Sequence, residues 1–221
     1  MRLHGTRLLR PPGVYAPQED TRLLARAVRD EPRTPGAVVL DVCTGTGALA
    51  LTAAAHGAAH VTAVDLSRRA VLAARWNARL RGLPVRAVRG SLLSAVPGRT
   101  FDLILSNPPY VPTPGPLPSG GAERAWRAGE DGRAVLDELC EGAPAALRPG
   151  GVLLVVHSAL CGTERTVEML RESGLSTRVV DREIVPYGPV MRRHARWLEE
   201  RGLVEPGVQK EELVVIRAER A

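Results

Sequence analysis

The chain of 221 residues contains almost no lysine, few cysteines and few aromatic residues. Lys210 is the one lysine among 30 basic residues, and aromatic side chains make up 3% of the sequence. The three cysteines, at positions 43, 140 and 161, form no CxxC pair and are odd in number, which argues against a disulfide framework and against a zinc site. We therefore expect a reducing, cytoplasmic setting and no bound metal.

Long apolar runs are missing as well. No stretch approaches the roughly 18 apolar residues of a membrane span, and residues 1–12 lack the apolar core of a secretory signal, so we expect no membrane association. The net charge of +6 is carried almost wholly by arginine, which indicates a compositional bias more than a nucleic-acid partner. The densest basic cluster, Arg192–Trp197, is interpreted as the solvated face of a helix over Met191–Arg201, with contact to RNA or to an acidic protein as the alternative.

Apolar periodicity predicts helices and strands that alternate along the chain. Strands are expected at 37–41, 60–64, 85–89, 101–106, 151–157, 177–185 and 211–217, and helices at 18–29, 48–56, 68–81 (with Ser67 as N-cap), 132–147 (kinked or broken at Pro144) and 163–172. This order predicts an α/β, Rossmann-like, doubly wound and mostly parallel seven-stranded sheet with helices on both faces. Residues 1–36 are expected to be an N-terminal extension and helix that pack on a catalytic domain of residues 37–221.

A glycine-rich turn joins the first predicted strand to the next helix. Cys43-Thr44-Gly45-Thr46-Gly47 follows an apolar run that ends in Asp41, and the two glycines let the backbone approach a ligand. The next strand ends in Asp65, whose carboxylate suits the two hydroxyls of a ribose. The turn also satisfies a loose dinucleotide fingerprint, so a nicotinamide oxidoreductase competes. Little chain remains for a substrate domain, and S-adenosylmethionine fits better.

The most informative stretch is Asn107-Pro108-Pro109-Tyr110, directly after the predicted strand 101–106. The prolines remove two backbone donors and stiffen the loop. The side-chain oxygen of Asn107 and the carbonyl of Pro108 are suited to accept both hydrogens of a planar NH2 group, with the Tyr110 ring over its face. The stretch predicts a site for an amide or an exocyclic amine, although an ordinary turn is the plain alternative.

The candidate residues converge in the predicted sheet. Asp41, Asp65, Ser91 and Asn107 all fall at carboxyl ends of strands, where doubly wound sheets bind their ligands. Residues 111–121, rich in proline and glycine, are interpreted as a mobile flap or a disordered connector. His157 stands alone in an apolar run, and we assign it to packing.

Taken together, these motifs resemble class I S-adenosylmethionine-dependent methyltransferases of the HemK-like group, which methylate a glutamine side-chain amide (N5) in translation release factors. The resemblance extends from about Val14 to the end and is closest to the short eukaryotic and archaeal type. It implies a role for each matching residue: Thr21 reaches the cofactor, Asp41 holds its methionine end, Gly45 and Gly47 form the cofactor turn, Asp65 binds the ribose, Asn107 to Tyr110 form the catalytic loop, and Gly129 to Gly132 are structural.

Two positions depart from the family pattern. Cys43 stands where a glycine or small residue is usual, which we expect to be tolerated at an ordinary negative φ. Ser91 replaces the acid that commonly reads the adenine amino group, and this loss of charge assistance lowers the expected cofactor affinity by on the order of 1 kcal/mol.

The expected reaction is direct methyl transfer to nitrogen, without a covalent enzyme intermediate, a metal or a general base. The same NH2 clamp suits adenine N6, so a methyltransferase of rRNA, tRNA or DNA is the runner-up. A noncatalytic S-adenosylmethionine-binding partner subunit is the alternative of another class.

The resemblance also bears on partners. It implies a release-factor protein as substrate, and short members of the group often work with a small zinc-binding activator at the sheet edge. Arg86 and Arg89 lie on the strand expected at that edge, and charged edges oppose strand pairing. We therefore favour a monomer.

Overall fold

The fold is described from a computed structural model, which covers residues 2–3, 6–115 and 122–221. Its centre is a seven-stranded sheet in the order β5-β4-β3-β6-β7-β9-β8. Its strands are β3 (Val38–Val42), β4 (His60–Asp65), β5 (Val85–Arg89), β6 (Phe101–Ser106), β7 (Leu147–Ser158), β8 (Leu175–Pro186) and β9 (Lys210–Arg220). Neighbours from β5 to β7 are parallel, and β9 lies antiparallel between β7 and β8. The predicted fold class is thereby confirmed.

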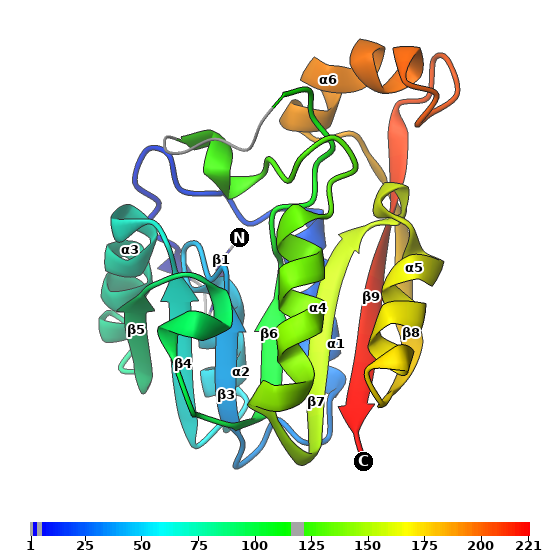
Figure 1. The fold of residues 1–221 in the computed structure, drawn as a ribbon. Coiled ribbons are helices and arrows are strands. Elements are labelled where there is room, and N and C mark those ends of the chain that lie inside the picture. Colours follow the sequence, from blue (N-terminus) through cyan, green and yellow to red (C-terminus); the bar gives the residue numbers. More distant parts are fainter. Residues whose placement is uncertain (1, 4–5, 116–121) are drawn as a thin grey trace.

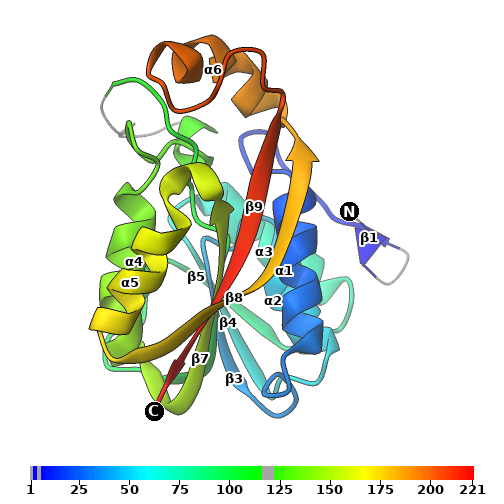
Figure 2. The ribbon, with the colours of Figure 1, turned by 90° about the vertical axis from the view of Figure 1, so that its right-hand side faces the viewer.

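Helices cover both faces of the sheet (Figure 2). The helices α4 (Ala134–Ala146) and α5 (Thr163–Glu172) lie on one face, and α1 (Glu19–Asp30), α2 (Ala48–Ala55) and α3 (Arg68–Arg79) lie on the other. Because both faces are covered, the central strands are buried on both sides and carry apolar runs instead of alternation. In β6, for example, Phe101, Leu103, Ile104 and Leu105 are all fully buried.

Local sequence signals account for both ends of α3. The Ser67 hydroxyl accepts a hydrogen bond from the backbone N–H of Ala70, which confirms the predicted N-cap of α3. Gly82 has a φ of +61° just beyond that helix, as a residue that ends a helix in the left-handed region does.

Several sequence expectations need correction. Of the kink or break expected at Pro144, the break does not occur, because α4 continues to Ala146. Pro144 lies in the last turn, where a missing backbone donor costs one hydrogen bond close to the natural end of the helix. The strands β7, β8 and β9 are longer than expected, and the antiparallel pairing of β1 (Arg2–Leu3) with β2 (Thr6–Arg7) was not anticipated.

The segment between β8 and β9 rises above the carboxyl ends of the parallel strands. It contains α6 (Pro189–Glu200), which lies beside the loops that follow β6 (Figure 1). Met191 and Leu198 of α6 are buried, whereas the Arg196 side chain is 90% exposed. Across the described ranges, no helix has the length and apolar character needed to cross a membrane.

Candidate active site

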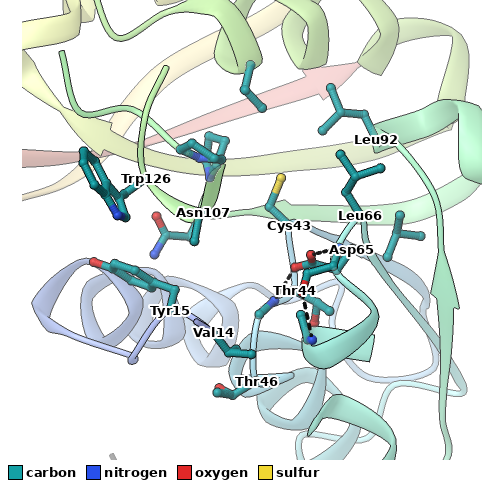
Figure 3. A pocket seen from close by; sticks show the side chains of 18 of the residues that line it. Val14, Tyr15, Cys43, Thr44, Thr46, Asp65, Leu66, Leu92, Asn107 and Trp126 are labelled. Atoms are coloured by element: carbon teal, nitrogen blue, oxygen red, sulfur yellow. Dashed lines mark hydrogen bonds between the residues drawn. The ribbon is translucent and has the colours of Figure 1, made fainter. Parts of the chain in front are cut away.

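A cavity of about 570 Å³ opens at the carboxyl ends of β3, β4, β5 and β6. Its size is typical of a site for a cofactor-sized ligand. Seven of the predicted site residues line it: Thr21, Gly45, Asp65, Ser91, Asn107, Pro108 and Tyr110. Figure 3 shows two ends, one with Asp65, Leu66 and Leu92, the other with Asn107, Tyr15 and Trp126. The strand-end convergence inferred from the sequence is thus present.

The Asp65 carboxylate is held by backbone donors. Its Oδ2 accepts a hydrogen bond from the N–H of Gly45 at 2.9 Å, and its Oδ1 accepts one from the N–H of Ser67 at 2.8 Å. Gly45 has a φ of +56°, and a Cβ built on it meets no atom within 4 Å. The turn therefore fixes the carboxylate and leaves open space beside its own backbone. Burial raises the pKa of Asp65, and these hydrogen bonds oppose the shift.

Two predicted cofactor residues lie behind the cavity wall. Asp41 is fully buried, and its Oδ2 accepts hydrogen bonds from the Thr44 hydroxyl at 2.5 Å and the Ala50 N–H at 3.0 Å. Burial raises the pKa of Asp41 to about 7. Gly47 has a φ of +85°, and an added Cβ lies 3.1 Å from Ala74, so this glycine is required for close packing of α2 on α3. Neither residue is among those lining the cavity.

The expectation of a negative φ at Cys43 is wrong. Its φ is +61°, and Leu92 has a φ of +41°; they are the two non-glycine residues with positive φ in the described chain. Both line the cavity. A non-glycine residue in this region costs on the order of 1–3 kcal/mol. The turn after β3 evidently needs the left-handed conformation at position 43, so the family's usual glycine there has a physical reason.

A chain of hydrogen bonds orients the Asn107 amide. Its Nδ2 donates to the Thr21 hydroxyl at 3.2 Å, and that hydroxyl donates to Asp20 Oδ1 at 3.1 Å. A carboxylate only accepts, so the Thr21 proton points to Asp20 and its lone pair is left for the Asn107 NH2 group. The Asn107 oxygen is then the amide atom left available to a ligand. Thr21 therefore orients Asn107, and the cofactor contact that the resemblance implies for Thr21 stays a prediction.

Asp20 also holds two tyrosines. Its Oδ2 accepts hydrogen bonds from the hydroxyls of Tyr15 at 2.8 Å and Tyr110 at 3.0 Å, and it is 3% exposed. Burial and the Asp20 charge raise the pKa of both tyrosines, so they remain donors at neutral pH. Sequence reasoning missed Asp20 and Tyr15 as separate contributors. The sequence feature that could have indicated both residues is their position in residues 14–21, where the resemblance to the family begins.

The loop after β6, which carries the predicted catalytic residues, is supported from behind by residues 126–132. Val111 N–H donates to Trp126 O at 3.0 Å, and Thr113 N–H donates to Gly129 O at 2.9 Å. Gly132, at a φ of +71°, packs so tightly that a Cβ on it falls 2.3 Å from the Tyr110 carbonyl oxygen. Of the expected flap, residues 111–113 are therefore anchored, and residues 116–121 lie outside the described residues.

Further lining residues come from elements that carry no recognisable motif. Trp126 and Glu138 line the cavity from the loop before α4 and from α4 itself. His157 is fully buried away from it, with Nδ1 2.8 Å from Ser158 O, and burial lowers its pKa to about 4. This agrees with its assignment to packing.

The sheet has seven strands that are mostly parallel, and the last strand in the chain is antiparallel. A glycine turn follows β3, and the neighbouring β4 ends in an acid suited to bind a ribose. Together these features define a class I methyltransferase that uses S-adenosylmethionine. Comparison with known proteins refines this class. Residues 5–115 match the family described as "Methyltransferase small domain". The chain belongs to this family.

Two relatives and one solved structure are informative. The chain is 33% identical over 190 residues to a putative protein N5-glutamine methyltransferase of Methanocaldococcus jannaschii, covering 86% of this chain and 94% of the relative. It is 46% identical over 158 residues to the release factor glutamine methyltransferase of Deinococcus radiodurans, covering 68% of this chain but 56% of that relative. The E. cuniculi Mtq2-Trm112 complex, which its title describes as methylating the eRF1 termination factor, shares the fold at a TM-score of 0.67 and 23% identity, covering 95% of this chain and 99% of that one.

The support behind the catalytic loop predicts unequal effects at two glycines. Gly132→Ala should destabilise the protein by about 2–4 kcal/mol, because a clash with the Tyr110 backbone adds to the cost of a positive φ. Gly129→Ala is the matched control: its φ is +86°, and the nearest atom to an added Cβ is 4.0 Å away. It should cost only about 1 kcal/mol. Urea unfolding measures both, and equal midpoints would contradict the tight packing.

Proposed function

We propose that this chain transfers a methyl group from S-adenosylmethionine to the side-chain amide nitrogen (N5) of a glutamine in a translation release factor. The observation that carries the proposal is the oriented Asn107 amide, which presents an acceptor oxygen in the same cavity as the Asp65 carboxylate. The names of the two relatives point to this acceptor class as well.

The cofactor would lie across the strand ends. The Asp65 carboxylate is suited to accept hydrogen bonds from the two ribose hydroxyls, and the open side of Gly45 admits the ligand close to the backbone. Ser91 lies in the same wall and offers a hydroxyl near the base. When bound, S-adenosylmethionine supplies a methyl group activated by a sulfonium. Asp41 supports the turn from below and Gly47 permits its packing, so both serve cofactor binding indirectly.

At the other end of the cavity, the chain's residues would prepare the nitrogen. An amide nitrogen is a poor nucleophile because its lone pair is delocalised. The Asn107 oxygen and the Pro108 carbonyl accept its two hydrogens, which turns the lone pair toward the methyl donor and stabilises the positive charge that develops. Tyr110, fixed by Asp20, and the rings of Tyr15 and Trp126 enclose the group. Orientation is the main contribution of these residues.

A small partner subunit is a further part of the proposal, by analogy with the Mtq2-Trm112 complex. β5 is an edge strand of the sheet, and α3 packs against it. Leu72 and Trp76 on α3 and Leu80 at its end are 50%, 56% and 60% exposed and follow one another at four-residue spacing, which is the pattern of an apolar ridge. One observation opposes the addition of a partner strand to β5. Arg75 already donates two hydrogen bonds to the Ala87 carbonyl of β5.

The acceptor class is tested by incubating the protein with labelled S-adenosylmethionine and, in parallel, release factor, ribosomal RNA, transfer RNA and DNA. We expect label in the release factor, at a glutamine identified by mass spectrometry. Label in nucleic acid alone would contradict the proposal and favour adenine N6. Tight cofactor binding with no label in any acceptor would favour a noncatalytic subunit.

The amide clamp is tested by two substitutions. Asn107→Ala should lower turnover at least tenfold and leave the dissociation constant for S-adenosylmethionine nearly unchanged, because the lost oxygen faces the acceptor. Thr21→Val should lower turnover in the same direction, since the Asn107 amide loses the partner that fixes its orientation, and Thr21→Ser should restore it. Unchanged turnover in Asn107→Ala would defeat the clamp.

Light scattering on the purified protein tests the partner. The chain alone should be a monomer, and Trp76→Glu should leave its own stability unchanged within about 0.5 kcal/mol while abolishing binding of any small subunit that copurifies with it. A stable homodimer that Trp76→Glu dissociates would show that a second copy, and no separate subunit, covers the ridge.

A further inference from the structure

A second, smaller cavity of about 60 Å³ lies beside the candidate active site. The two cavities share five wall residues, namely Tyr15, Asp20, Tyr110, Val111 and Trp126. The tyrosine pair held by Asp20 therefore forms a partition with the methyl-transfer site on one side and the second cavity on the other.

The far wall of the second cavity is mostly apolar and comes from the segment that rises above the strand ends. It includes Val185 and Pro186 at the end of β8, Val190 and Met191 at the start of α6, and Leu213 of β9. His194 of α6 lies against Trp126, with ring centroids 5.7 Å apart. The segment between β8 and β9 thus touches the shared partition and forms part of the far wall of the second cavity.

Three acidic side chains line the cavity; Glu19 and Asp20 come from α1, and Glu211 is the one that joins the mostly apolar far wall. Glu211, at the start of β9, lines the cavity and is 9% exposed. Its Oε2 is buried and has no hydrogen-bond partner among the described residues. Burial, together with the nearby Asp20 charge, raises the pKa of Glu211 to about 7, although a hydrogen bond from Ser158 opposes the shift.

A buried carboxylate oxygen without a donor is costly. Because Glu211 lies at the wall of a cavity, a ligand that enters the cavity is placed to supply that donor. A ligand group that fits this cavity carries an N–H that donates to Glu211, and it is mostly apolar like the far wall. It is also compact, because the cavity is too small for a large side chain. A main-chain amide of a peptide meets these conditions.

We propose that the second cavity is a subsite for the acceptor protein, in which Glu211 accepts a hydrogen bond from a main-chain N–H next to the methylated glutamine. This inference rests on the proposed function. It assigns to the segment 186–210 the task of recognising the acceptor, and it explains why Tyr15 and Tyr110 are held rigidly: they separate the reacting amide from the peptide that carries it.

Two substitutions probe the subsite and leave the residues of the clamp, Asn107, Thr21 and Asp20, unchanged in the sequence. Glu211→Gln removes the charge and replaces one acceptor oxygen by an NH2 group. Gly188→Val fills the cavity: Gly188 has a φ of −67°, which valine adopts, and an added Cβ lies 3.3 Å from Oε1 of Gln18, the end of a flexible side chain. Glu212→Gln is the matched control, because Glu212 is the next residue of β9 and pairs with Arg182 at the surface.

The measurement is calorimetric binding of a purified release factor to the full chain loaded with S-adenosylhomocysteine. Glu211→Gln and Gly188→Val should each weaken binding at least fivefold, with S-adenosylhomocysteine affinity unchanged, and Glu212→Gln should bind as the wild type does. Equal affinity in all four proteins would overturn the subsite. Binding with these differences but without methyl transfer would refute the proposed function and keep the subsite, whereas no binding by the wild type would refute both.

Discussion

The buried Asp20 carboxylate is the constraint on which the site depends. It accepts four hydrogen bonds, from the Tyr15 and Tyr110 hydroxyls and from the backbone N–H and hydroxyl of Thr21. Hydrogen bonds to an ionised group are about twice as strong as neutral ones, and four of them offset the cost of burying the charge. Because the partners belong to the N-terminal segment and to the loop after β6, one side chain locks together two stretches about 90 residues apart in sequence. Because Asp20 fixes the Thr21 hydroxyl, it also determines that the NH2 group of Asn107 faces Thr21.

The rest of the site is built from a strained backbone on a rigid frame. Cys43 and Leu92 hold positive φ angles at the cavity wall, and Gly45 and Gly47 do so within the turn after β3. Such conformations persist because the surrounding structure holds them, with the inner residues of β3 and β4 buried. The turn after β3 places the Gly45 N–H against Asp65 and leaves space where a ligand must approach. Fold stability and ligand geometry are thus linked at the same residues.

The sequence predicted the sheet, its seven strands and the strand-end cavity, because apolar periodicity and glycine turns are local signals. It failed where the deciding contacts are distant. Pro144 is tolerated because α4 ends two residues later, which the strength of the proline signal hides. Asp41 and Gly47 stay predicted cofactor residues, but their contacts with Ala50 and Ala74 could not be predicted, because only the fold brings these residues close. Asp20 and Glu211 carry no motif of their own, and their importance arises from burial against segments far along the chain.

The central claim is that Asn107 presents its side-chain oxygen, fixed by Thr21 and Asp20, to an acceptor amide within reach of a cofactor at Asp65. The most direct measurement is a crystal structure with S-adenosylhomocysteine and a glutamine-containing peptide of the release factor. The account predicts the ribose hydroxyls on Asp65 and the glutamine NH2 group in hydrogen-bond contact with Asn107 Oδ1 and the Pro108 carbonyl. A glutamine bound elsewhere, or an Asn107 amide turned so that its NH2 group faces the acceptor, would contradict it.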